Sequence, residues 1–428
     1  MHRLTKIIRE DMIPALGVTE PGAIAFAAAT ARTMIGGRLV RLTVSMNSGL
    51  YKNAYSCGLP GVEEVGAVFA AALGYTAGDP EKGLEALSDV GPEDVAAAGA
   101  YVAQGKITAD MSEISSRIRL VASLETDEGT AEVEIRGRHT NIVRRTVNGT
   151  DVFTGKDEEA AAGENDAAEI RTLTLREMLA YAETVPAEEI GFIREAHQMN
   201  LALFEEGLRS SRTTFVHRLL EMNGGTVYSG DERKTASLLC NGAIEARVLG
   251  LNRPAMSITG SGAHGIMATL PLYAVCQVRH LPEERLLRAT AMSFLICMYI
   301  KSWSGRLSAL CGCALAGGTG AACGLCLLSG GGEKEISAAI RNMASGITGM
   351  ICDGGNQGCV MKGIAACDAA FSASSLGMTG VSVDSVHGIN GRTPEETMRN
   401  IGRIASPGMT GTEETIVGIQ RNKGTDSP

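Results

Sequence analysis

Two cysteines, Cys352 and Cys359, flank a glycine-rich loop, and Cys311-Gly312-Cys313 precedes another run rich in glycine. Thiolates are ligands for soft metals and iron–sulfur clusters, and glycine lets a backbone bend around a bulky group. Cys313, Cys352 and Cys359 could therefore hold a cluster through three protein ligands. Such a cluster leaves one iron open, where it can act as a Lewis acid on a substrate.

The choice of cysteine ligands stays open at this stage. Cys311 competes with Cys313, because two residues so close on a turn or helix point in different directions and one cubane would use only one of them. A set of buried structural thiols and a zinc site are the other interpretations, although the spacings match no zinc-finger or ferredoxin signature. Three further cysteines lie in apolar helical runs and are predicted to be core residues: Cys323, Cys326 and Cys367.

A second motif, Gly260-Ser261-Gly262-Ala263-His264-Gly265, is rich in glycine. Its backbone amides could approach an anion at the start of a helix, and a substrate carboxylate is a suitable guest. His264 could then act as an acid or base, or orient the substrate. The alternative is a tight turn between helices with a structural histidine, because the glycine pattern fits no nucleotide fingerprint.

Two N-terminal segments carry further candidates. In Gly17–Gly22, Thr19 suits a helix N-cap, and Glu20 either faces a site or complements the helix dipole. Residues 45–54 follow a predicted strand, as ligand-binding loops often do. Lys52 in that segment could pair with a carboxylate or act as a desolvated base, and the alternative is a solvated surface lysine.

Composition indicates a soluble globular protein. The 428 residues suffice for two or three domains, and 44% of them are hydrophobic. The net charge of −9 and the lack of long basic runs argue against a nucleic-acid surface. The N-terminus lacks the apolar core of a signal peptide, so we expect a cytoplasmic location where the eleven cysteines form no disulfides. The uncharged stretch 307–332 contains many glycines, and we expect two buried helices there and no membrane span.

The elements that must position these residues change along the chain. The early part alternates helical and strand patterns, and the later part is almost entirely helical, which predicts an α+β fold. We predict an α/β domain with N-terminal helices over residues 1–172 and an all-helical iron–sulfur catalytic domain over 173–428. Residues 156–168 are acidic and are predicted to form an exposed, mobile linker. The principal predicted helices cover 1–16, 23–34, 61–73, 92–104, 175–184 and 187–223, and the predicted strands cover 39–46, 118–124, 131–136 and 142–147.

Several segments, taken in order, resemble the L-cysteine desulfidase family, a branch of the iron–sulfur L-serine dehydratase alpha-chain superfamily. The resemblance covers nearly the whole chain, and several ordered segments are more specific than any single one. The matching segments are 14–17 with 19–25, 52–54, 58–61, 78–84, 260–266, 311–313, 352–354 and 358–359 with Lys362.

The resemblance implies an enzyme with a [4Fe-4S] cluster and no pyridoxal phosphate. It would eliminate a β-hydroxyl or β-thiol from a small amino acid, or a related hydroxy acid, to give a keto acid and, from an amino acid, ammonia. No nucleic acid or membrane partner is expected, and a homodimer is one option for the assembly. The predicted catalytic residues are Glu20, Lys52 and His264, and the predicted substrate-binding residues are Thr19, Ser45, Asn47, Asn53, Ser261, Gly262, Asn356 and Lys362.

The chain departs from the desulfidase pattern at three places. Val18 replaces a cysteine, Asn356 and Gln357 replace a loop with a lysine, and His264 stands where many relatives have Asn-Gln. A valine can neither take a proton nor ligate iron, so cysteine need not be the substrate. The alternative functions are a non-catalytic sensor of a metabolite or redox state and a zinc-binding protein.

Overall fold

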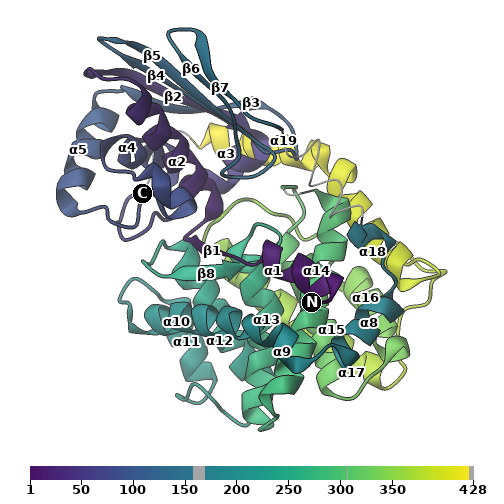
Figure 1. Ribbon diagram of the computed structural model, residues 1–428. Helices are drawn as coiled ribbons and strands as arrows, with labels where there is room; N and C mark the ends of the chain where they lie inside the picture. The colour runs from purple at the N-terminus through teal and green to yellow at the C-terminus, as the bar shows by residue number, and fades with distance from the viewer. Residues whose placement is uncertain (158–168, 306, 424–428) are drawn as a thin grey trace.

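The computed structural model describes residues 1–157, 169–305 and 307–423. Two hydrophobic cores form in these residues. One lies under a six-stranded sheet and the other among the helices of the C-terminal part. Figure 1 shows the sheet and its covering helices on one side of the molecule and the larger helical region on the other. The predicted α+β fold is confirmed, and the domain boundary at residue 172 stays a prediction.

The sheet has the strand order β3-β2-β4-β5-β6-β7. Strand β2 pairs in parallel with β3, and the other neighbouring strands pair antiparallel. Alternation along β2 directs Leu42, Val44 and Met46 into the core, whereas Thr43 and Ser45 lie on the other face. The strands are β2 (Leu39–Asn47), β3 (Ile107–Glu113), β4 (Arg119–Thr126), β5 (Gly129–Arg136), β6 (Ile142–Val147) and β7 (Thr150–Thr154).

Alanine-rich helices cover one face of this sheet. They are α2 (Thr19–Met34), α4 (Gly66–Thr76) and α5 (Pro92–Ala103). The small side chains let α2 pack closely, so that every residue from Thr19 to Ala31 is buried. Glu20, at the first turn of α2, is therefore held inside the molecule.

The prediction of one helix over residues 1–16 is wrong for its last five residues. Helix α1 (Arg3–Asp11) ends, and β1 (Ile13–Leu16) pairs antiparallel with β8 (Pro254–Ser257). Pro14 disfavours a helix, and a partner strand far along the chain supplies the backbone hydrogen bonds. The apolar face of α1 joins the helical core. This short ribbon brings the turn at residues 17–22 beside the loop at residues 258–262.

The remaining helices form one packed region. The predicted helix 187–223 is divided, because the Glu245 carboxylate accepts hydrogen bonds from the backbone N–H groups of Thr214, Phe215 and Val216 and starts a new helix there. The helices are α8 (Leu175–Thr184), α9 (Ala187–Ile190), α10 (Arg194–Arg209), α11 (Phe215–Met222), α12 (Glu232–Val248), α13 (Gly262–Val278), α14 (Glu283–Ser304), α15 (Gly318–Leu328), α16 (Glu333–Ile347), α17 (Gly358–Met378), α18 (Pro394–Arg403) and α19 (Thr410–Asn422).

The structure describes one further predicted segment, the uncharged stretch 307–332, in full, and little of another, the predicted linker 156–168. In the uncharged stretch 307–332, a π-helical turn (Cys313–Gly317) continues into α15. None of the described helices combines the length and the apolar character that crossing a membrane requires. Most of the predicted linker, residues 158–168, lies outside the described residues.

The C-terminal helix α19 connects the two regions. It packs against α3 (Ser48–Ala54), the short helix that follows β2, and Figure 1 shows the two side by side. The residues predicted to carry chemistry come from both regions, so their contacts depend on how this boundary is built.

Candidate active site

Exposure separates three cysteines from the rest. Cys313, Cys352 and Cys359 are partly exposed, and the other eight cysteines are buried, Cys311, Cys323, Cys326 and Cys367 among them. The three are the predicted cluster ligands. Their accessibility is what ligands of a reactive group require, whereas buried thiols behave as small core residues.

Backbone pairing brings the two cysteine segments together. The Cys311 N–H donates to the Met350 carbonyl (2.9 Å), and the Cys352 N–H donates to the Ala309 carbonyl (2.7 Å). A single bridge between Leu310 and Ile351 completes this contact. Cys359 lies in the first turn of α17, and Cys313 starts the π-helical turn. The two segments thus present three thiols to one place.

The thiols affect one another electrostatically. Burial and the neighbouring Cys352 and Cys359 raise the pKa of Cys311 to about 12. Burial and its cysteine neighbours also raise the pKa of Cys313, and burial and Cys352 raise that of Cys359. Thiolates this close repel each other, so their joint ionisation requires a compensating positive group. A bound metal supplies that charge, and the donor set therefore fits a thiolate-held cluster.

The geometry of these thiols differs from that of a single-ion site. Within residues 1–157, 169–305 and 307–423, no three His, Cys, Asp or Glu side chains form a group that could hold a metal ion. In a cluster each thiolate binds its own iron, so the cysteines surround the group and need not converge on one atom.

His264 lies directly against the cysteine segment. A methyl group added at Gly312 would be 2.5 Å from His264 Nε2, so the imidazole occupies the space that a side chain between Cys311 and Cys313 would need. Burial, followed by the charges of Lys301 and Arg247, holds the pKa of His264 well below its usual value. The imidazole is therefore neutral at pH 7.

The other nitrogen of His264 is fixed by Thr259. Thr259 Oγ1 lies 2.6 Å from Nδ1 of His264 and 2.7 Å from the Ile258 carbonyl oxygen. The hydroxyl has one proton, so donation to the carbonyl assigns the imidazole proton to Nδ1 and leaves Nε2 as an acceptor. Thr259 has a φ of +54°, a left-handed conformation that is strained for a β-branched residue and that sequence reasoning did not anticipate.

Glu20 forms the centre of a buried polar group. Its carboxylate accepts hydrogen bonds from Thr19 Oγ1 (3.0 Å) and Asn53 Nδ2 (2.9 Å), and His139 Nε2 lies 3.7 Å away. Burial alone raises the pKa of Glu20, but His139, Asn53 and the charge of Arg247 together lower it to about 2. Glu20 is therefore ionised at neutral pH, and Thr19 also reaches the Gly260 carbonyl (3.5 Å).

Val18 and Asn53 connect this polar group to the cysteine loop. A methyl group at Gly355 would be 2.9 Å from a methyl carbon of Val18, so the valine packs on the loop between Cys352 and Cys359. Cys352 Sγ donates to Asn53 Oδ1 (3.8 Å), and the Gly355 N–H donates to the Asn53 carbonyl (3.3 Å). The predicted departure at position 18 thus lies against the predicted cluster loop.

Lys362 and Asn356 have different surroundings. Lys362 forms an ion pair with Asp353. Burial lowers the pKa of Lys362, but the hydrogen bond to Asp353, followed by the charges of Cys359, Asp353 and Cys352, raises it above its usual value. Asn356 Oδ1 accepts a hydrogen bond from the Gly358 N–H (2.8 Å), which orders the loop before α17. Lys362 is thus a cation beside the thiols, and Asn356 shapes the loop.

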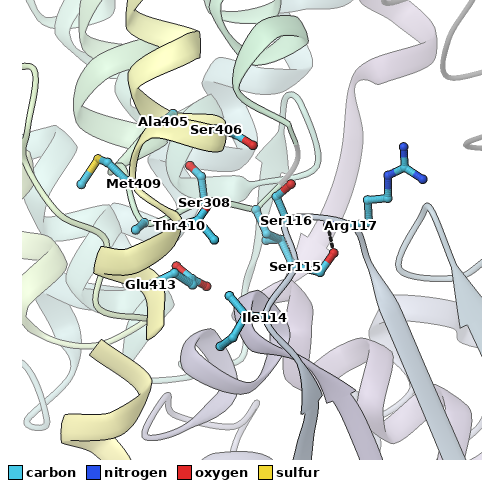
Figure 2. Close-up of a pocket in the computed structure, with 12 residues that line it drawn as sticks. Ile114, Ser115, Ser116, Arg117, Ser308, Ala405, Ser406, Met409, Thr410 and Glu413 are labelled. Atoms are coloured by element: carbon cyan, nitrogen blue, oxygen red, sulfur yellow. Dashed lines mark hydrogen bonds between the residues drawn. The ribbon is translucent and has the colours of Figure 1, made fainter. Parts of the chain in front are cut away.

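The ammonium group of Lys52 is hydrogen-bonded to other residues of the protein. Its Nζ donates to Glu413 Oε2 (2.6 Å) and to the Ser308 carbonyl (3.0 Å). Both charged side chains are buried. Glu413 and Ser308 also line a cavity of about 230 Å³ between the β3–β4 connection and α19, which Figure 2 shows. The cavity lies beside the Ala309–Cys352 backbone contact and contains none of the predicted site residues.

Two predicted substrate-binding residues lie elsewhere. Asn47 Nδ2 donates to the Ser115 carbonyl (2.8 Å), and its Oδ1 accepts from the Arg119 N–H (3.2 Å). Ser45 lies on the sheet face opposite the core. By contrast, Ser261 and Gly262 stand at the start of α13, within the group formed by Thr19, His264 and the cysteines.

Sequence reasoning missed Arg247 and His139. Arg247 is only 4% exposed, and its charge acts on Glu20, His264, Cys313 and Cys359. His139 faces Glu20. Two charges, Glu245 and Arg247, within the otherwise small and mostly apolar run 236–251 were an available signal, whereas nothing local distinguishes His139.

The fold and site thus define an α+β protein with three accessible thiols, a neutral histidine and a buried carboxylate at the boundary of its two regions. The family model described as serine dehydratase alpha chain matches residues 81–418. The chain belongs to this family.

Similar proteins match along nearly their full length. A UPF0597 protein of Clostridium botulinum (strain Langeland) is 39% identical over 421 residues, covering 97% of each chain. A UPF0597 protein of Caldanaerobacter subterraneus subsp. tengcongensis is 35% identical over 98% of each chain. A UPF0597 protein of Clostridioides difficile is 33% identical over 97% of this chain and 99% of its own.

Proposed function

We propose that the protein is an iron–sulfur lyase that performs α,β-elimination on a small β-hydroxy or β-thiol amino acid. In this reaction the α-proton passes to a base, and the bond from Cβ to oxygen or sulfur breaks with its electron pair on the leaving atom. The resulting aminoacrylate takes up a proton at Cβ to become an imine, and addition of water to the imine releases ammonia and a keto acid. Membership of the serine dehydratase alpha-chain family supports this class of chemistry.

One observation carries the proposal: two segments bring the three partly exposed thiols together beside a neutral histidine. Cys313, Cys352 and Cys359 would hold a [4Fe-4S] cluster. When bound, that group supplies a Lewis-acidic iron. We assign Cys313 in preference to Cys311 because it is more exposed.

The surrounding residues have distinct roles in this proposal. His264 Nε2, which lies at Gly312 and carries no proton, accepts the α-proton. Glu20, ionised and held by Thr19 and Asn53, is too weak a base for that step and binds a positive group such as the substrate ammonium. Lys52, which is hydrogen-bonded to Glu413 and to the Ser308 carbonyl, ties α3 to α19.

Val18 bears on the choice of substrate. It packs on the cysteine loop where the L-cysteine desulfidase pattern has a thiol, and it offers no proton acceptor. A β-hydroxy amino acid is therefore our first choice of substrate, and a β-thiol amino acid the second. We further propose a cytoplasmic location, where thiols stay reduced, and a homodimer as the assembly.

Anaerobic purification followed by iron, sulfide and zinc analysis tests the cluster, and a screen of serine, threonine and cysteine for ammonia release tests the chemistry. We expect a brown protein with about four irons per chain and turnover of at least one substrate. A colourless, iron-free protein after anaerobic reconstitution contradicts the proposal. Zinc at one ion per chain identifies the zinc-binding alternative, and a full cluster without any turnover identifies the sensor.

A further inference from the structure

Arg247 is a buried cation that lacks the partner such a group requires. It lies in the last turn of α12, and its Nε atom has no hydrogen-bond partner among the described residues. No described carboxylate forms an ion pair with it, in contrast to Lys52. Burial of an unpaired charge is costly, so a natural protein keeps one only where something compensates it.

A second buried charge on the same helix shows the contrast. Glu245, two residues earlier, is completely buried and accepts hydrogen bonds from Thr214, Phe215 and Val216, at 2.7 to 3.0 Å. Its role is to cap α11. Arg247 has no comparable role in the packing of α12.

The guanidinium points at the start of α13. A methyl group added at Gly262 would lie 2.8 Å from Arg247 Nε, so the absence of a side chain there lets the cation approach the helix terminus. The first N–H groups of a helix have no partners within the helix, and the Ser261 side chain does not cap them. Free N–H groups and a guanidinium together form a site for a planar anion.

The position of this site relative to the other groups fits one end of a small substrate. Gly262 and Ala263 precede His264, and Cys313 Sγ donates to the Ala263 carbonyl (3.3 Å). Thr19, adjacent to Glu20, reaches the Gly260 carbonyl. The anion site is therefore bounded by the thiols, the neutral histidine and the ionised carboxylate.

We propose that Arg247 and the N-terminus of α13 bind the carboxylate of the substrate. The inference rests on the proposed function for the identity of the reaction, but the anion site itself depends only on Arg247 and α13. A guanidinium suits this role better than an ammonium, because its planar fork matches a carboxylate with two parallel hydrogen bonds.

The variants Arg247→Met and Arg247→Lys in the full-length protein test the inference. The matched control is Arg253→Met, which removes an exposed arginine six positions later that pairs with Glu206. Binding is measured by calorimetry with L-serine, L-threonine and L-lactate, each beside its carboxamide. Where the ammonia screen gives a substrate, KM and kcat are measured as well.

We expect the wild type and the control to bind at least one acid about tenfold or more tightly than its amide. Arg247→Met should lose that preference, and KM should rise at least tenfold with a smaller change in kcat. Arg247→Lys should recover part of the preference. The melting temperature of Arg247→Met should equal or exceed that of the wild type, because no internal partner is left unpaired.

Two results would overturn the inference. One is a wild-type protein that binds no acid more tightly than its amide. The other is an Arg247→Met variant that keeps the preference for the acid, or whose melting temperature falls as it does when a buried ion pair is broken. Failure of the proposed function has a different signature, since it is read from iron content and ammonia release. A protein that contains no iron and releases no ammonia, but binds acids selectively through Arg247, would refute the proposed function and support the anion site.

Discussion

Two clusters of buried charge lie where the sheet region meets the helical region, and they differ in how completely their charges are partnered. In the paired cluster, Lys52 bonds to Glu413 and to the Ser308 carbonyl. In the open cluster, Glu20 is bonded, but His139 Nε2 and Arg247 Nε have no hydrogen-bond partners among the described residues.

The difference indicates separate roles. Buried polar groups are nearly always hydrogen-bonded, so an exception calls for an explanation, and a ligand that completes the set is one. The paired cluster holds α3 against α19 and needs nothing further. In the open cluster, Arg247 and Thr19 lie against the start of α13, next to the thiols, which is where the proposed substrate would bind.

The largest effect is expected from the thiols beside the open cluster. Cys352→Ser should reduce bound iron and turnover to background, because a hydroxyl is a poor ligand for iron in a cluster. Cys323→Ala, in the buried interior of α15, should keep the iron content of the wild type. Iron and sulfide analysis of anaerobically purified protein provides the measurement.

Cys311→Ser beside Cys313→Ser sharpens the ligand assignment. Only the Cys313 variant should lose iron, since Cys311 is buried and Cys313 is accessible. The reverse result would transfer the ligand role to Cys311.

The next effect concerns the paired cluster. Lys52→Met leaves the Glu413 carboxylate buried and unpaired, which should lower the free energy of unfolding by about 3–5 kcal/mol. The double variant Lys52→Met with Glu413→Leu should recover most of this loss. Urea unfolding monitored by circular dichroism measures both. A Lys52→Met variant that keeps its stability but loses turnover would instead support the predicted catalytic role of Lys52.

A smaller, pH-dependent effect is expected from Glu20. Its pKa is lowered from the ordinary value of 4.5 to about 2, so its ionised form stabilises the folded state. That contribution is complete above pH 4.5 and is lost as the pH falls towards 2. Over this interval the wild type should lose on the order of 3 kcal/mol more than Glu20→Gln. Parallel pH profiles for the two proteins would contradict the assignment.

The smallest effect lies away from both clusters. Thr174 caps α8 by accepting a hydrogen bond from the Glu177 N–H, and Glu177 accepts one from the Thr174 N–H in return. Thr174→Ala should therefore cost about 1 kcal/mol of stability and leave iron content and substrate binding unchanged. Thermal unfolding and iron analysis provide a baseline against which the cluster variants can be judged.

Local sequence patterns determined much of the architecture. Alternating apolar residues identified β2, β4, β5 and β6, and helical periodicity identified most helices before residue 223 and the helical character of the rest, because both signals depend on neighbours within a few residues. Glycine-rich surroundings distinguished Cys311, Cys313, Cys352 and Cys359 from the cysteines in apolar runs, and of these four all but Cys311 are partly exposed. The motif at His264 and the turn at Glu20 also lie beside the thiols, as their ordered occurrence indicated.

Tertiary structure alone decided how these pieces meet. Pairing of β1 with β8 joins residues about 240 positions apart, replaces the last four residues of a predicted helix and sets the Glu20 turn beside the α13 loop. The tertiary structure likewise gives Lys52 a partner in Glu413 and brings His139 to Glu20. It leaves Arg247 Nε without a hydrogen-bond partner among the described residues. A residue's type fixes what chemistry it can offer, but whether a buried charge is satisfied depends on segments distant in sequence, and here that distinction separates a structural lysine from a proposed substrate anchor.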